Sequence, residues 1–223
     1  MVDTITCVSM RWQGFQFHRL PYRLFFTVFP LRPLTLLSRQ PTPAKKTTYW
    51  YRPHTSKTRL PVLFIHGIGI GLYPYVNFFA QINQKDGSSA QDGEIGIIAI
   101  EMMPVSFRLT SPALEKDEMC DEIHKILEKH GWDRVVLVSH SYGTVDPYHN
   151  VLMVETDEIL GSVISTHLLH NSKTSQLCGP VFLIDPVSIL LHLPDVAYNF
   201  TCRKPRRANE HQLYCKSYET GLA

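Results

Sequence analysis

The chain has 223 residues, 44% of them hydrophobic, and its 22 Lys and Arg residues against 20 Asp and Glu residues give a formal net charge of +2. This composition is that of a globular domain with a sizeable core, and it excludes a disordered or collagen-like chain. A net charge so close to zero argues against nucleic acid as a partner. The five cysteines lack C-x-x-C spacing and are odd in number. They favour reduced thiols in an intracellular chain, cytoplasmic or membrane-associated, over a disulfide framework.

Residues 1–47 are basic, rich in proline and aromatic residues, and without a clean hydrophobic period. They carry a single acid, Asp3, against seven Lys and Arg residues. The apolar run 24–29 stops at Pro30 and is too short to cross a bilayer as a helix. We therefore expect a poorly ordered basic extension. Two alternatives remain open: an arm that makes peripheral contact with a membrane, or a transit peptide, which shares the Arg-rich and acid-poor character.

Residues 48–223 alternate between strand and helix signals. Strands are expected at residues 48–52, 60–65, 95–100, 134–138 and 179–185, and helices at 77–83, 112–130 and 162–169. The clearest helix has Ser111 as its N-cap and Pro112 at its first position, and it ends at Gly131. This βαβ rhythm predicts an α/β fold, a three-layer sandwich around a mostly parallel sheet.

An apolar strand runs directly into a tight turn at residues 135–144, VVLVSHSYGT. The turn is centred on Ser141 and is close to the G-x-S-x-G pattern, with Ser139 in place of the first glycine and Gly143 in place of the second. A strained turn of this kind needs small residues two positions before and after the central serine, and both are small here. The pattern therefore predicts an exposed nucleophilic serine at the end of a strand.

A second motif, PVLFIHGI at residues 61–68, is another apolar strand that ends in His66-Gly67 and continues into a glycine-rich loop. It lies about 75 residues before the serine turn. Together, the two motifs and the strand order resemble the serine hydrolases of the α/β-hydrolase-fold superfamily, of which a fungal branch is one option. The resemblance covers roughly residues 48–212.

This resemblance implies an esterase or lipase that acts on a small apolar ester or acyl compound and uses no cofactor. Ser141 would attack the carbonyl carbon, and the backbone N–H groups of Ile68 and Tyr142 would form the oxyanion hole. His66 would be a structural residue of the turn. His140, beside the nucleophile, would pack or line the pocket. The aromatic residues that follow the turn could line an apolar pocket, with core packing as the alternative for some of them: Tyr73, Tyr75, Phe78 and Phe79.

The remaining triad members are harder to assign. In this fold the order along the chain is serine, acid, histidine. Asp185 is the candidate acid, and the alternative is that it caps the segment before Pro186. Only His192 and His211 are plausible histidines after it, and neither is assigned.

Two departures from the family pattern leave other functions open. Residues 144–161 separate the serine turn from the apolar helix that should follow it, so we interpret them as an insertion or a translated intron. No obvious strand pair follows Asp185, so we expect the domain to be incomplete and to lack the last strands. The alternatives are a catalytically inactive fragment or binding protein, and an acyltransferase.

Metal and dinucleotide sites are not expected. His167 and His170 lie three positions apart without an acidic partner. The glycines at residues 67–71 do not match G-x-G-x-x-G, because Pro74 interrupts the helix that would have to follow. The basic cluster at residues 203–207 is interpreted as a solvated loop.

Overall fold

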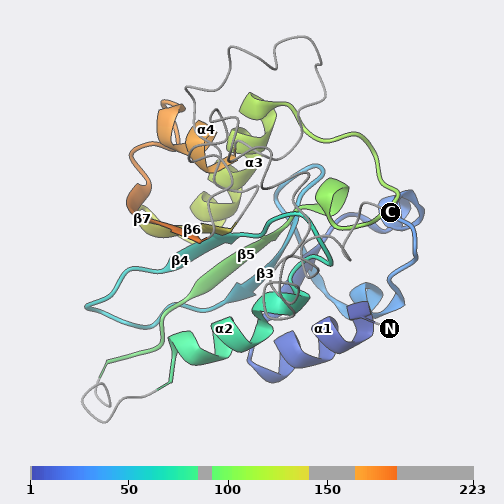
Figure 1. The fold of residues 1–223 in the computed structure, drawn as a ribbon, viewed down its shortest axis with the longest axis horizontal. Coiled ribbons are helices and arrows are strands. Elements are labelled where there is room, and N and C mark those ends of the chain that lie inside the picture. The colour runs from blue at the N-terminus through green and yellow to red at the C-terminus, as the bar shows by residue number, and fades with distance from the viewer. Residues whose placement is uncertain (1, 85–91, 141–163, 185–223) are drawn as a thin grey trace, which may run out of the picture.

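The computed structural model describes residues 2–84, 92–140 and 164–184 (Figure 1). The α-helices are α1 (Val2–Trp12), α2 (Val76–Ile82), α3 (Lys116–Lys129) and α4 (Ile164–His170). The strands are β1 (Gln16–Arg19), β2 (Gln40–Pro41), β3 (Thr48–Arg52), β4 (Val62–Ile65), β5 (Ile97–Glu101), β6 (Val135–His140) and β7 (Cys178–Ile184). Short 3₁₀ helices lie at η1 (Tyr22–Thr27), η2 (Pro33–Leu37), η3 (Tyr73–Tyr75) and η4 (Met103–Val105).

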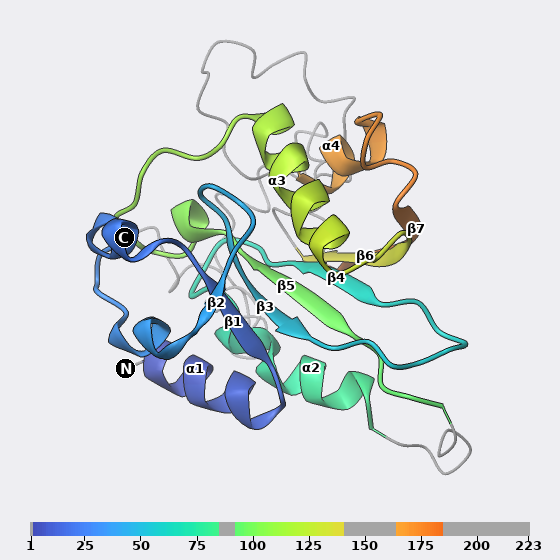
Figure 2. The same ribbon diagram turned by 180° about the vertical axis from the view of Figure 1, so that it is seen from behind.

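All seven described strands form one mixed sheet in the order β2-β1-β3-β5-β4-β6-β7. The neighbours β5, β4, β6 and β7 are parallel, whereas β3 runs antiparallel to β5 and β1 runs antiparallel to β3. Helices α1 and α2 cover one face of the sheet, and α3 and α4 cover the other (Figures 1 and 2). The expected three-layer α/β sandwich with a mostly parallel sheet is confirmed.

Both faces of the central strands are buried, which explains why they are continuous apolar runs. In β5 every residue is buried: Ile98 and Ile100 face the core under α3 and α4, and Ile97 and Ala99 face the core under α1 and α2. The alternation follows from the period of two in a strand. Strand signals of this kind predicted β3 to β7 to within a few residues.

Helix α3 begins later than the sequence predicted. Its N-cap is Glu115 rather than Ser111, and Pro112 lies outside the helix. The predicted end is confirmed, because Gly131 has a φ of 66° and its N–H donates to Glu128 O at 3.0 Å. A left-handed C-terminal residue of this kind favours glycine.

The structure differs most from expectation at residues 2–47, which we had interpreted as a poorly ordered extension. This segment supplies α1 and the strands β1 and β2 of the sheet. Its apolar residues join the core between the sheet and α2: Cys7, Met10, Phe15 and Phe17. These buried positions are too irregularly spaced for a single period, because they belong to a helix, a turn and a strand.

Within the described ranges, no helix is long and apolar enough to cross a membrane. Cys7 and Cys120 are buried free thiols, and Cys178 is free and half-buried.

A cluster of hydrogen-bonded rings joins β1, β3 and the end of α3. The Tyr49 hydroxyl lies 3.0 Å from Nδ1 of His18 and 2.9 Å from Nε2 of His130. Burial, and then the nearby Lys129 ammonium, lower the pKa of His18 and that of His130 to about 4. Both imidazoles are therefore neutral in the folded protein at neutral pH.

Because of this cluster, we expect mild acid to destabilise the folded protein. A histidine in the unfolded chain has a pKa of about 6.5. Between pH 6.5 and 4 the unfolded chain therefore binds protons that the two buried imidazoles of the folded protein do not bind. The free energy of unfolding should be nearly constant above that window and fall by about 2 to 4 kcal/mol across it. Urea denaturation at a series of pH values measures the slope. In His18→Phe the slope should be shallower, and an unchanged slope would contradict this assignment.

Candidate active site

The two motif segments leave neighbouring strands side by side. Strand β4 pairs with β6 in parallel, and Ile65 is in register with Ser139. His66 therefore follows β4 at the same level at which His140 ends β6. Because parallel strands end at the same edge of a sheet, the glycine-rich loop and the serine turn both begin at the carboxyl edge, where α/β proteins bind ligands.

His66 ties the glycine-rich loop to the segment after β5. Its Nδ1–H donates to Gly67 O at 2.7 Å, and its Nε2 accepts the Met102 N–H at 3.0 Å. Burial lowers the pKa of His66, and the acceptor role of Nε2 requires the neutral ring. With both ring nitrogens used, His66 is a structural residue, as the sequence predicted.

Two glycines and one backbone hydrogen bond set the conformation of the loop after His66. Gly69 and Gly71 have φ values of 143° and 72°, which strongly favour glycine. The Gly69 N–H donates to Val105 O at 3.0 Å. Ile68, directly before Gly69, has an exposed side chain, and no hydrogen bond of the described residues uses the Ile68 N–H. This N–H is one of the two donors expected for the oxyanion hole.

A tyrosine connects the two motif segments. The Tyr75 hydroxyl lies 2.8 Å from Nδ1 of His140, and the rings meet edge to face with centroids 5.5 Å apart. Burial raises the pKa of Tyr75 to about 12, partly offset by a hydrogen bond with the Gly67 backbone. The phenol is therefore protonated, and its O–H can donate to the imidazole. Gly67 and His140 thus both contact Tyr75 at the carboxyl ends of β4 and β6. His140 packs there, as expected.

The serine that replaces the first glycine of the turn pattern has a partner of its own. Ser139 is completely buried, and its hydroxyl donates to the Ser165 hydroxyl on α4 at 3.3 Å. Ile164 and Leu168 of α4 pack into the core beside α3. A small polar side chain therefore fits at this position, and it links the strand before the turn to the helix that the sequence placed next in the fold.

The remaining expected site residues lie outside the described residues: Ser141, Tyr142, Gly143, Asp185, His192 and His211. Residues 144–161, interpreted as an insertion, lie outside them too. What the structure brings together is the strand end before Ser141, the Ile68 loop and Tyr75.

The expectation of an aromatic pocket lining is only partly met. Phe79 is completely buried and packs edge to face on Phe64, with ring centroids 4.9 Å apart. Phe78 is half-buried in the same core cluster. Tyr73 is exposed, and of the four only Tyr75 contacts His140 at the end of β6. The reason is helical periodicity, because α2 turns its phenylalanines toward the sheet.

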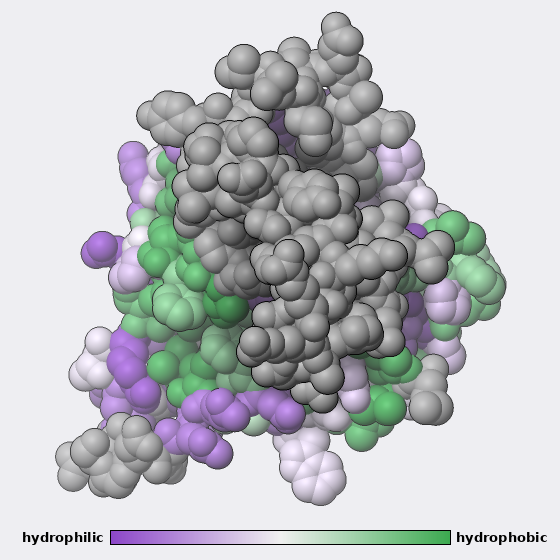
Figure 3. Space-filling view, in the orientation of Figure 1, coloured by the Kyte–Doolittle hydropathy of each residue, from purple (hydrophilic) through white to green (hydrophobic). Residues whose placement is uncertain are grey.

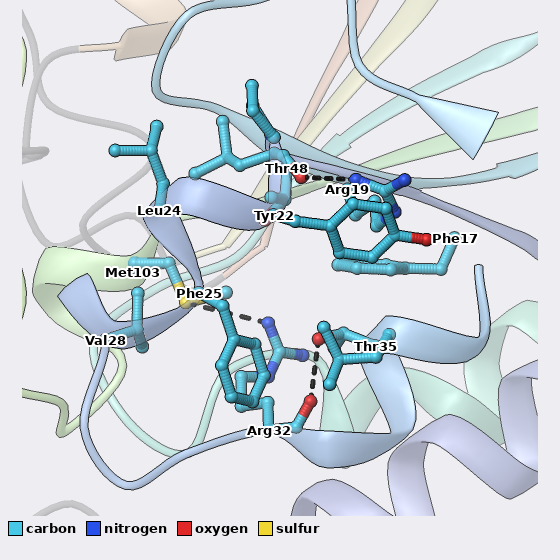
Figure 4. Close-up of a pocket in the computed structure, with 13 residues that line it drawn as sticks. Phe17, Arg19, Tyr22, Leu24, Phe25, Val28, Arg32, Thr35, Thr48 and Met103 are labelled. Atoms are coloured by element: carbon cyan, nitrogen blue, oxygen red, sulfur yellow. Dashed lines mark hydrogen bonds between the residues drawn. The ribbon is translucent and has the colours of Figure 1, made fainter. Parts of the chain in front are cut away.

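A small cavity of about 60 Å³ lies between η1 and the strands β1 and β3 (Figure 4). Its lining is mainly apolar, with Phe17, Phe25 and Met103 among the side chains, and Arg32 at one wall. None of the residues that connect the two motifs lines it. In the part of the chain that the structure describes, no group of three His, Cys, Asp or Glu side chains could hold a metal. His170 instead bonds through Nδ1 to Thr166 O at 2.9 Å.

Sequence reasoning did not identify two contributions to the site region. Tyr75 was expected only to line a pocket, and its bond to His140 spans 65 positions of sequence. Glu101, the last residue of β5, is completely enclosed by partners from β3 and from residue 32. A charged residue at the end of a five-residue buried strand was the one available signal for Glu101.

No family model matches this sequence, and no curated protein matches it. Solved structures do. A putative lipase from Acinetobacter baumannii is 14% identical, with a TM-score of 0.49, 97% of this chain covered and 57% of that one. A bacterial membrane phospholipase A is 12% identical, with a TM-score of 0.45 and coverages of 83% and 44%. Naproxen esterase from Bacillus subtilis is 8% identical, with a TM-score of 0.44 and coverages of 78% and 52%. The chain spans about half the length of these structures.

The architecture itself defines the class. In the described residues, β3 runs antiparallel to both β1 and β5, the strand order β3-β5-β4-β6 is crossed, and the His66-Gly67 turn follows β4, which is the arrangement of the α/β-hydrolase fold. The chain has that fold.

Proposed function

We propose that this protein is a serine hydrolase that cleaves a small apolar carboxylic ester, with Ser141 as the nucleophile. The observation that carries the proposal is the contact among Gly67, Tyr75 and His140, which joins the glycine-rich loop to the residue before Ser141. One trans peptide separates the Cα atoms of His140 and Ser141 by about 3.8 Å. The contact therefore bears on the geometry between the nucleophile and the oxyanion loop.

In the proposed reaction the Ser141 hydroxyl adds to the ester carbonyl carbon while a base accepts its proton. The carbonyl oxygen becomes an oxyanion that accepts hydrogen bonds from the Ile68 and Tyr142 N–H groups. Collapse expels the alcohol, which takes the proton from the base, and water then releases the acid from the acyl-enzyme. Because His66 uses both ring nitrogens, the base is a different histidine. Asp185 is the acid that we propose to orient it.

Covalent labelling tests the proposal without knowledge of the natural substrate. A fluorophosphonate ester should phosphonylate Ser141 with loss of fluoride, and peptide mass spectrometry should locate the adduct on that serine. Ser141→Ala protein should remain unlabelled. A folded chain that never labels would favour the binding protein over the hydrolase. Transfer of the acyl group to added methanol in preference to water would favour the acyltransferase.

Tyr75→Phe should lower kcat several-fold with little change in the free energy of unfolding. Phenylalanine keeps the ring that packs on Phe64 but removes the hydroxyl that holds His140, a net loss of about 1 kcal/mol for one hydrogen bond. The serine turn and the loop that carries Ile68 would then be less well aligned, and small misplacements of catalytic groups are costly. Tyr73→Phe is the matched control, because Tyr73 lies in the same turn and is exposed. Equal kcat values for the two variants would contradict the positioning role.

A further inference from the structure

Three loops of the described chain lie at the same edge of the sheet as the candidate site. Strand β1 is antiparallel to β3, which is antiparallel to β5, so β1, β4 and β5 all run in one direction. The segments that follow them, residues 20–39, 66–75 and 102–111, therefore all begin at the carboxyl edge. Backbone hydrogen bonds join them: Phe29 and Leu109 exchange two, of 2.9 and 3.0 Å, and the Gly69 N–H donates to Val105 O.

These three loops expose large apolar side chains to solvent. Phe26, Leu109 and Phe29 are 79%, 73% and 61% exposed. We call the following set the apolar rim: Tyr22, Phe26, Phe29, Leu31, Ile68, Ile70, Tyr73, Phe107 and Leu109. Figure 3 shows apolar side chains at the right margin of the molecule, where η1 lies in Figure 1. A set of this size on one edge indicates an interaction surface rather than scattered surface residues.

The charge of the same loops is of one sign. Residues 20–39, 66–75 and 102–111 contain no Asp or Glu, and their charged residues are Arg23, Arg32, Arg39 and Arg108. Arg32 pairs with Glu101 and Arg108 with Asp3, whereas Arg23 and Arg39 are exposed. Many of the acids of the described chain lie on α3 rather than on these three loops. The molecule therefore presents an apolar, positively charged edge, which is complementary to an anionic lipid surface.

We propose that the apolar rim docks this protein on an anionic membrane, with its candidate site facing the lipid. The exposed phenylalanines and leucines enter the boundary between headgroups and acyl chains, and Arg23 and Arg39 contact acidic headgroups. If the proposed hydrolase function also holds, the substrate is an ester drawn from the lipid layer. The docking itself does not depend on that function.

Vesicle co-sedimentation of the full chain carrying Ser141→Ala tests docking in the absence of turnover. The vesicles are phosphatidylcholine alone or phosphatidylcholine mixed with phosphatidylserine. The protein should partition onto the mixed vesicles, and less as salt is raised. The pair Phe26→Asp and Leu109→Asp should lower this partition at least about tenfold, because two apolar side chains no longer insert. Each of Arg23→Ala and Arg39→Ala should lower it about fivefold on anionic vesicles only.

Trp12→Asp is the matched control. Trp12 is 89% exposed at the far end of α1, about 13 Å of helix away from Asp3, which pairs with Arg108. This variant should bind vesicles like the parent chain. The substituted side chains are all exposed, so thermal melting of every variant should match the parent and exclude misfolding as the cause.

Two results would overturn docking: no partition onto anionic vesicles, or partition that only Trp12→Asp reduces. A dimer that Phe26→Asp converts to monomer would also overturn it, because the rim would then join two copies. The hydrolase proposal fails separately. Vesicle binding without fluorophosphonate labelling would remove the hydrolase and leave docking. Labelling of Ser141 without vesicle binding would remove docking and leave the hydrolase.

Discussion

Replacing Ser141 with alanine is expected to lower kcat for a short p-nitrophenyl ester by about 10⁴-fold or more. The reason is that no other group at the site is proposed to form the acyl-enzyme. The Ile68 and Tyr142 N–H groups would still polarise the carbonyl, so hydrolysis above the water rate should persist at a low level. KM should change little, because the serine hydroxyl contributes little to the binding of the ground state.

Release of p-nitrophenolate, followed by absorbance, measures this effect. Ser111→Ala is the control, because Ser111 is an exposed serine outside the two motif segments. It should keep the full rate. Equal rates for Ser141→Ala and the parent chain would show that any hydrolysis comes from elsewhere, and the nucleophile assignment would be lost. A fully inactive parent chain that still folds and binds an apolar ligand would favour a binding role.

The central strands could be predicted from sequence because they are buried on both faces. Runs such as residues 62–65 and 97–100 are apolar throughout, and each is followed by a turn signal. The same local patterns located the two motif segments. The structural role of His66 and the meeting of the two motifs at one site were implied by the family resemblance, because β4 and β6 are not consecutive strands in the chain.

The N-terminal segment could not be predicted in the same way. Its residues are buried by elements far away in sequence, as when Phe15 packs on Phe79 with ring centroids 5.6 Å apart. Its arginines suggested a solvated chain, yet Arg32 is buried because Glu101 lies 69 positions later. A local pattern carries no information on such pairs. The predicted start of α3 was wrong for a related reason. Pro112 belongs to the preceding loop, and Glu115 is the N-cap.

The ion pair between Arg32 and Glu101 fastens that N-terminal segment to the end of β5. The guanidinium donates to both carboxylate oxygens of Glu101, at 2.8 and 2.7 Å, and Thr48 and Trp50 donate to the same carboxylate at 2.8 and 3.0 Å. Burial alone would raise the pKa of Glu101, but the guanidinium and the hydrogen bonds hold it below its usual range. Both side chains are therefore charged, and the charge of each is the main factor that offsets the free-energy cost of burying the other.

Arg32→Met should accordingly lower the free energy of unfolding by about 3 to 5 kcal/mol, because it leaves the Glu101 carboxylate buried without its counter-charge. Glu101→Leu should cost a similar amount for the opposite reason. The double variant should cost clearly less than the sum of the two, because no isolated charge remains. Lys173→Ala is the control: Lys173 Nζ lies 2.7 Å from Asp121 Oδ1 in a pair whose side chains are 59% and 42% exposed. Loss of this exposed pair should cost at most about 1 kcal/mol.

Urea denaturation at neutral pH measures all four variants. Strict additivity of the two single changes would mean that the charges do not stabilise each other. The two single variants should also expose the N-terminal segment to solvent before the rest of the sheet unfolds, because Arg32 is the buried side chain that holds this segment against β5. Faster proteolysis within residues 20–39 of Arg32→Met, at a urea concentration where Lys173→Ala resists cleavage, is the corresponding local result. Since that segment also carries Phe26 and Phe29 of the apolar rim, its loosening should weaken vesicle binding while the bond between Tyr75 and His140 is retained.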